Sequence, residues 1–166
     1  MQTIVITGSP GAGKTSISDE LSEKLRERNI PHTIIDPDEI ARIFPKRSLS
    51  KLKWDALAKL YPLYVENKVS KIIIPVTVDD DSDLEEIRKI FGEENVEVFS
   101  LIVDESILVE RVVAREPNEY WQKTLSNLVR AYVRNGDSRS FSSVEITVGD
   151  SSIVEICDMI LKKILK

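Results

Sequence analysis

The chain has 166 residues, of which 42% are hydrophobic and 31% charged, and its formal net charge is −5. This length and composition predict a single soluble domain, residues 1–166, with one buried core. The acidic excess argues against broad attraction to a nucleic-acid backbone or an anionic membrane, so we expect a small-molecule partner. We expect the protein to be a monomer or a homodimer. A single cysteine excludes an internal disulfide. No stretch resembles a signal peptide or a membrane span, so we expect a cytoplasmic location.

Five short apolar runs alternate with amphipathic segments along the chain. Their clustered β-branched residues predict strands at 3–7, 32–36, 71–78, 96–103 and 144–148. Apolar residues at helical spacing predict a helix that begins near Asp38 and turns Ile40, Ile43 and Phe44 inward. The same spacing predicts helices at 14–29, 51–67, 82–91, 105–115, 118–134 and 152–165. This order predicts an α/β fold with helices on both faces of a five-stranded parallel sheet.

The connection between the first strand and the first helix reads GSPGAGKT and satisfies the pattern G-x-x-x-x-G-K-[ST]. Its glycines permit positive φ values, which turn consecutive N–H groups toward one anion at the positive end of the helix. We expect Lys14 to reach the β- and γ-phosphates of ATP and the Thr15 hydroxyl to complete the coordination of Mg²⁺. The residues expected to bind the nucleotide are Gly8, Ser9, Pro10, Gly11, Ala12, Gly13, Lys14, Thr15 and Ser16.

Two segments typical of switch GTPases are missing from the sequence. The stretch NKVS at 67–70 lacks the aspartate of the guanine-binding N-K-x-D segment, and no D-x-x-G segment occurs. The remaining class is that of the small phosphotransferases, in which an acceptor site and an arginine-bearing lid occupy the rest of the chain.

Several stretches resemble adenylylsulfate kinase and its relatives among the small P-loop kinases, such as gluconate kinase and shikimate kinase. The stretch DPDEIAR at 36–42 is similar to the family's D-G-D-x-x-R segment. The stretch ERVVAREPNEYWQK resembles the family's lid and implies a lid near 111–139. The last strand and helix resemble the family's closing elements, whose connecting loop packs against adenine. The resemblance implies the three-layer P-loop NTPase fold.

The same resemblance implies an ATP- and Mg²⁺-dependent kinase that moves the γ-phosphoryl group to a hydroxyl of a small metabolite. Thr15 and Asp36 would organise the metal, and Asp36 or Asp38 would accept or orient the acceptor proton. Arginines on one helix face would close over the γ-phosphoryl group. The implied catalytic residues are Lys14, Asp36, Asp38, Arg111 and Arg115, and the candidate acceptor-binding residues are Asp38, Arg42 and Asp79.

The segments that would bind the acceptor depart from the family's pattern. Adenylylsulfate kinases carry basic residues after the third strand, where this chain reads VTVDDDSD, and four carboxylates there would repel a dianionic acceptor. Arg42 falls one residue late. Pro75 stands where many relatives carry an aspartate near the metal, which leaves Asp36 as the better candidate.

Each of these segments also has a simpler interpretation. Asp36 and Asp38 could serve only to cap the next helix, and the acidic run at 79–83 could cap the following one instead of binding a cationic or hydroxyl-rich acceptor. The two arginines could be solvated and paired with neighbouring glutamates. Aromatic residues at 54, 61 and 64 could belong to the core or stack on an acceptor. For the whole chain, the alternative function is a nucleotide-binding regulator or slow ATPase that acts on a protein partner.

Overall fold

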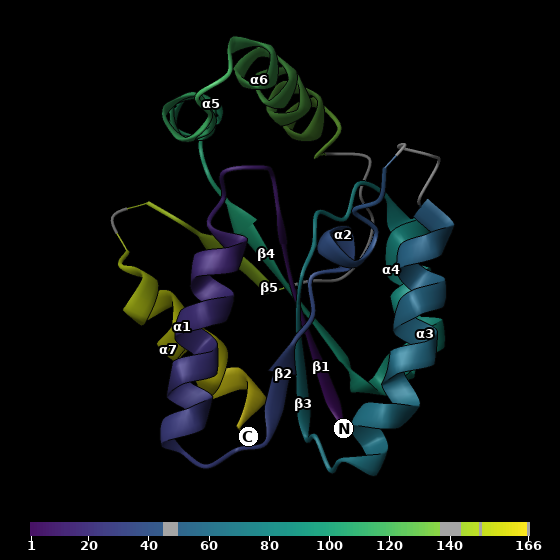
Figure 1. Ribbon diagram of the computed structural model, residues 1–166. Helices are drawn as coiled ribbons and strands as arrows, with labels where there is room; N and C mark the ends of the chain where they lie inside the picture. Colours follow the sequence, from purple (N-terminus) through teal and green to yellow (C-terminus); the bar gives the residue numbers. More distant parts are fainter. Residues whose placement is uncertain (45–49, 137–143, 150, 166) are drawn as a thin grey trace.

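The computed structural model describes residues 1–44, 50–136, 144–149 and 151–165 (Figure 1). Its five strands form one sheet in the order β2-β3-β1-β4-β5, and all neighbouring pairs are parallel. The predicted α/β fold is therefore confirmed. The elements are β1 (Gln2–Gly8), α1 (Lys14–Glu27), β2 (His32–Ile34), α2 (Pro37–Ile40), α3 (Ser50–Glu66), β3 (Lys71–Pro75), α4 (Asp81–Phe91), η1 (Glu93–Asn95), β4 (Val96–Ile102), α5 (Glu105–Arg115), α6 (Glu119–Arg134), β5 (Val144–Thr147) and α7 (Ile153–Ile164).

Helices cover both faces of the sheet, and successive residues of β1 point to opposite faces. Ile4 and Ile6 join a core with α1 and α7, whereas Val5 joins a second core with α3 and α4 (Figure 1). Both faces of the central strands are therefore buried. This arrangement explains why the strand sequences are continuously apolar and lack polar alternation.

Strand β3 is shorter than predicted because its partner turns away. The strand ends at Pro75, and the expected continuation through residue 78 is wrong. The Val76 N–H still donates to the carbonyl of Ile6 at 3.1 Å, but β1 then enters the glycine loop. The Val78 N–H donates instead to the hydroxyl of Thr7, at 3.0 Å. The end of β3 is thus fastened beside the loop by a side chain.

The prediction for the helix after β2 is correct at its start and wrong beyond its first turn. The Asp36 carboxylate accepts from the N–H groups of Asp38 and Glu39, which begins α2, but the helix has only four residues. Ile43 and Phe44 are 47% and 98% exposed and do not turn inward. Helical spacing of apolar residues shows which side an extended helix would bury, but it does not show where the helix ends.

Helices α5 and α6 form a hairpin on the side of the sheet where the strands have their carboxyl ends (Figure 1). Leu108, Val112 and Val129 anchor this hairpin in the same core as α1 and α7. The lid predicted near 111–139 falls on the end of α5 and on α6, with 137–139 outside the described residues, and its role as a lid stays a prediction. In the part of the chain that the structure describes, no helix has the length and apolar character needed to cross a membrane.

Candidate active site

The glycine loop joins β1 to α1, and α5 packs directly against it. Gly11 has a φ of +85°, and a Cβ at this position would lie 3.1 Å from Cγ1 of Val112 and 3.2 Å from the carbonyl oxygen of Leu108. Gly13 has a φ of +96° at the start of α1, where only the left-handed conformation calls for glycine. One glycine therefore permits a close approach, and the other permits the turn into the helix.

A cavity of about 570 Å³ lies beside this loop, a volume that suits a small-molecule ligand. The loop, the start of α2, the end of β3, the last turns of α5 and the segment before α7 all contribute to its walls. It brings together eleven of the fifteen predicted site residues: Pro10, Gly11, Ala12, Gly13, Lys14, Thr15, Ser16, Asp36, Asp38, Arg111 and Arg115. The other lining residues are Ile17, Pro75, Thr77, Val148, Gly149, Ser151, Ile153 and Ile156.

The Lys14 ammonium lies over the glycine loop and donates to two carbonyl oxygens of the loop itself. Its Nζ is 2.8 Å from the oxygen of Gly8 and 3.1 Å from that of Ser9. Burial lowers the pKa of Lys14 to about 8, although the negative charges of Asp38 and Asp36 oppose this change. A nucleotide phosphate would compete with the two carbonyls for the ammonium and would favour its charged form.

We expect ADP binding without metal to weaken by about tenfold between roughly pH 7 and pH 9, because a group with a pKa of about 8 loses its proton in this range. At lower pH the free protein already carries the Lys14 proton. At higher pH the phosphate must restore it, so affinity is lost as the pH rises. Isothermal calorimetry with ADP and EDTA measures the change. In Lys14→Arg the side chain stays charged, and a pH dependence that persists there would contradict the assignment.

Asp36 serves as a helix cap and also lines the cavity. Its Oδ1 accepts from the N–H of Asp38 at 2.9 Å and from that of Glu39 at 3.3 Å, so the capping role is confirmed for Asp36. The cap fixes the carboxylate at the cavity wall. Asp38 follows at the same wall, where desolvation raises its pKa and the nearby Lys53 opposes the rise.

Four predicted site residues are not in the cavity lining: Gly8, Ser9, Arg42 and Asp79. Arg42 lies beyond the single turn of α2, where its Nη2 is 2.7 Å from Oε1 of Glu39, and its side chain is 77% exposed. Asp79 is exposed after β3 and acts on Lys14 through its charge. The acceptor-binding roles of Arg42 and Asp79 therefore stay predictions.

The acidic run after β3 begins α4, as its simpler interpretation proposed. The Oδ1 atom of Asp80 accepts from the Ser82 N–H at 2.9 Å, from the Ser82 hydroxyl at 2.5 Å and from the Asp83 N–H at 3.4 Å. These hydrogen bonds lower the pKa of Asp80, the one from the hydroxyl most strongly. Asp80 is therefore the N-cap of α4.

Asp80→Ala is expected to lower the free energy of unfolding by about 1 kcal/mol, because the first N–H groups of α4 lose their acceptor. The affinity for ADP should stay unchanged. Urea denaturation measures the stability change. Glu85→Ala, which removes an exposed carboxylate later in the same helix, serves as the control, and an equal loss in both variants would contradict the capping role.

The aromatic residues of α3 belong to the core, which confirms the simpler of their two interpretations. Trp54 is buried, and Tyr61 and Tyr64 pack partly buried against the same cluster. The Tyr61 ring meets the ring of Phe91 edge to face, with centroids 5.1 Å apart.

Sequence reasoning missed two groups of residues at this site. The segment before α7 contributes Val148 and Gly149 to the cavity. The resemblance of the closing elements implied a loop that packs against adenine here, but it named no residue. Lys53 lies next to Asp38, a residue of the cavity wall. The sequence did not indicate this, because nothing distinguishes one lysine on an amphipathic helix from the others.

Comparison with known proteins identifies the family. The sequence pattern of a family described as AAA domain matches residues 4–136, which include the glycine loop and both arginines of α5. The chain belongs to the AAA domain family. The curated relatives that it matches are kinases, and the chain has the P-loop kinase fold that the sequence predicted.

Two curated relatives match this AAA domain over most of its length. The L-seryl-tRNA(Sec) kinase of Methanococcus maripaludis is 28% identical over 170 residues, and the match covers 98% of this chain and 64% of that protein. The chain therefore spans less than two thirds of this relative's length. The adenylate kinase of Nocardia farcinica is 30% identical over 148 residues, which are 78% of each protein.

Solved structures share the fold of this AAA domain. A gluconokinase from Sinorhizobium meliloti superposes with a TM-score of 0.66 at 17% identity and covers 99% of this chain and 91% of its own. The Mycobacterium tuberculosis APS kinase, solved in complex with AMPPNP and APS, also gives a TM-score of 0.66 at 17% identity, with coverages of 99% and 98%. Such low identity supports the common architecture alone.

Proposed function

We propose that this P-loop kinase transfers the γ-phosphoryl group of ATP to a hydroxyl of a small metabolite. The observation that carries the proposal is the cavity in which Lys14, two carboxylates and two arginines meet beside the glycine loop. Phosphoryl transfer depends on positioning and charge compensation, and a positively charged loop with carboxylates at the same wall supplies both.

The residues at the cavity have distinct roles in this reaction. The loop N–H groups and Lys14 would hold the β- and γ-phosphates. The acceptor oxygen would form a bond to the γ-phosphorus while the bond to the leaving oxygen of ADP breaks, and the acceptor proton would pass to Asp36 or Asp38. Arg111 and Arg115 would compensate the charge of the transferring group.

The donor set of the cavity fits Mg²⁺ carried on the nucleotide. Mg²⁺ prefers oxygen ligands and usually keeps phosphate oxygens and waters, so it needs few protein groups. Within the described residues, no cluster of three or more His, Cys, Asp or Glu side chains could hold a metal ion. The Thr15 hydroxyl and the Asp36 carboxylate would hold the ion, which would neutralise phosphate charge. Oδ1 of Asp36 caps α2, which leaves Oδ2 for this role.

The charge of the acceptor side favours a neutral or cationic acceptor over a dianionic one. Asp36 and Asp38 line the cavity, and the charge of Asp79 reaches Lys14 in the same region. A sulfated or phosphorylated acceptor would approach these carboxylates against their charge. Hydroxyl-bearing sugars, amino acids and aminoacyl groups carry no such penalty.

An acceptor panel tests the proposal. ADP release from Mg–ATP is measured with L-serine, L-seryl-tRNA(Sec), D-gluconate, shikimate, adenylyl sulfate and AMP, and mass spectrometry identifies the phosphorylated product. Stimulated release together with a phosphorylated hydroxyl supports the proposal. Stimulation by AMP with formation of ADP from it would point to phosphate as the acceptor group. ATP binding without stimulation by any compound would favour the regulator or slow ATPase.

A further inference from the structure

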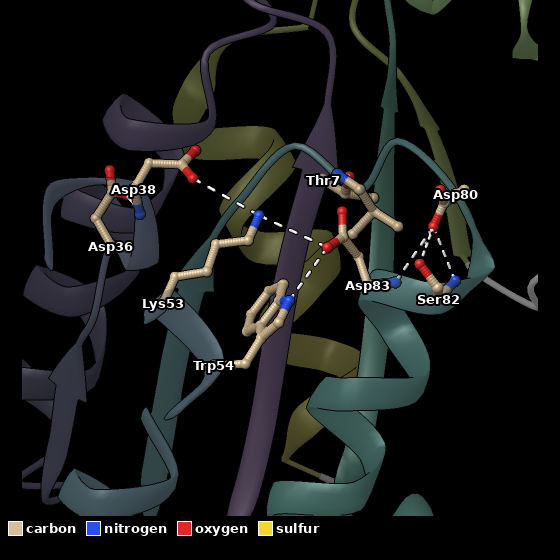
Figure 2. Close-up of polar contacts among 9 residues, drawn as sticks. Thr7, Asp36, Asp38, Lys53, Trp54, Asp80, Ser82 and Asp83 are labelled. Carbon is tan, nitrogen blue, oxygen red and sulfur yellow. Dashed lines mark hydrogen bonds and ion pairs between the residues drawn. The ribbon is translucent and has the colours of Figure 1, made fainter. Parts of the chain in front are cut away.

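Lys53 lies on α3, outside the residues assigned to the reaction above. Its ammonium stands between two carboxylates that come from different helices (Figure 2). The Nζ atom is 3.8 Å from Oδ1 of Asp38 and 3.7 Å from Oδ1 of Asp83. The lysine side chain is only 12% exposed. Lysine is rarely so buried unless it is paired, and here both partners lie near the carboxyl edge of the sheet.

Of the two carboxylates beside Lys53, that of Asp83 is held firmly by its surroundings. Its side chain is 16% exposed, and its Oδ1 accepts a hydrogen bond of 3.2 Å from Nε1 of the buried Trp54 (Figure 2). Its backbone N–H donates to Asp80 in the cap of α4. The Lys53 ammonium also lies 4.5 Å from the centroid of the Trp54 ring, within range of a cation–π interaction. The packed core thus holds one end of the ion-pair chain.

The other carboxylate beside Lys53, that of Asp38, is held less firmly. It belongs to the four-residue helix α2, which is too short to be stable through its own backbone hydrogen bonds. Its carboxylate also lies close to that of Asp36, and the two negative charges repel each other. Lys53 and, to a smaller degree, Lys14 supply the compensating positive charge. Lys53 does so from a helix that is anchored in the core.

We propose that Lys53 is a positioning residue that holds Asp38, and with it the first turn of α2, at the wall of the cavity. Asp83 and Trp54 hold Lys53 in turn. The inference rests on the proposed function because Asp38 is there a candidate for orienting the acceptor. Both nitrogen–oxygen distances exceed hydrogen-bond length, so the ammonium acts through its charge between two groups and not through a bond to one of them.

Hydrogen–deuterium exchange of the segment 37–41 tests this role without an acceptor. In Lys53→Met, the amides of residues 38–41 in this segment should exchange about two- to fivefold faster. This is the change in local opening expected from the loss of one partly exposed ion pair. Exchange in the glycine loop and in α7 should not change. Lys53→Arg should restore slow exchange because it keeps the charge. Lys89→Met removes an exposed lysine of α4 that pairs with Glu86, and it serves as the matched control.

A second variant, Asp83→Asn, tests the same role in case Lys53→Met does not fold. Asp83→Asn keeps an acceptor for Trp54 but removes the anchor charge of Lys53, so exchange at 37–41 should rise although Asp83 lies far from this segment in the sequence. In the double variant with Lys53→Met the increase should not add. Unchanged exchange at 37–41 in folded Lys53→Met, or an equal increase throughout the chain, would overturn the proposal.

Kinetics separate this inference from the proposed function. With whichever panel compound stimulates ADP release, Lys53→Met should raise the acceptor KM by about two- to fivefold, by the same ion-pair contribution, and leave the affinity for ADP unchanged. If no panel compound stimulates release, the proposed function fails while the exchange experiment still decides the role of Lys53. An unchanged acceptor KM beside faster exchange would overturn the link between the position of Asp38 and acceptor binding.

Discussion

Lys14→Met is expected to lower the rate of phosphoryl transfer by about 10²- to 10³-fold, because the variant removes the positive charge placed to stabilise the transferring phosphates. Methionine has nearly the length of lysine but no charge and no donor. The Lys14 ammonium already contacts the carbonyls of Gly8 and Ser9, so it stands where the glycine loop turns its N–H groups toward an anion. ADP release from Mg–ATP, with and without the stimulating acceptor, measures the loss.

The fold should tolerate this substitution. Burial lowers the pKa of Lys14 to about 8, which means that the protein disfavours its charge when no phosphate is present. Removing that charge should leave the urea midpoint unchanged or raise it. Lys59→Met, which removes an exposed lysine of α3, is the control for activity and stability. Phosphoryl transfer at the wild-type rate in Lys14→Met would contradict the role of the loop, whichever acceptor is used.

The central architecture was predictable because its signals are local. Continuous apolar strands such as 3–7 follow from burial on both faces of a sheet, and the two cores around Ile4 and Val5 show that burial. The glycine loop was predictable for the same reason, since the requirements for positive φ and for a lysine at a helix start fall within eight consecutive residues. Patterns of this kind do not depend on what the rest of the chain contacts.

The acceptor side was less predictable because long-range contacts decide it. The length of α2 could not be read from the spacing of Ile43 and Phe44, since that spacing carries no information on whether a core lies beneath them. Lys53 meets Asp38 and Asp83, which are 15 and 30 residues away, only because α2, α3 and α4 converge at one edge of the sheet. The sequence pattern of a single helix or strand does not show which residues of other elements it contacts.

The arginines of α5 were predictable only in part. Their spacing places both on one face of the helix, but it does not show which groups they contact. Arg111 donates from Nη1 to the carbonyl of Gly11 at 3.3 Å, and Arg115 pairs with Glu116 at 3.1 Å, so the solvated pairing weighed from the sequence is present for Arg115. Both side chains nevertheless line the cavity. An exposed ion pair contributes little to stability, so it does not account for that position.

Arg115→Ala is therefore expected to lower kcat by about 10³-fold, because the transferring phosphoryl group loses the compensating charge that we propose Arg115 of α5 supplies. The affinity for ADP, which lacks the γ-phosphate, should change little, and the urea midpoint should stay constant. Arg115→Lys should recover only part of the rate, since an ammonium cannot make the paired contacts of a guanidinium. Steady-state kinetics with the panel acceptor measure these values, and Arg134→Ala on α6 is the control for loss of an exposed arginine. If Arg115→Ala leaves kcat unchanged, its pairing with Glu116 is its whole role, and charge compensation by α5 would depend on Arg111 alone.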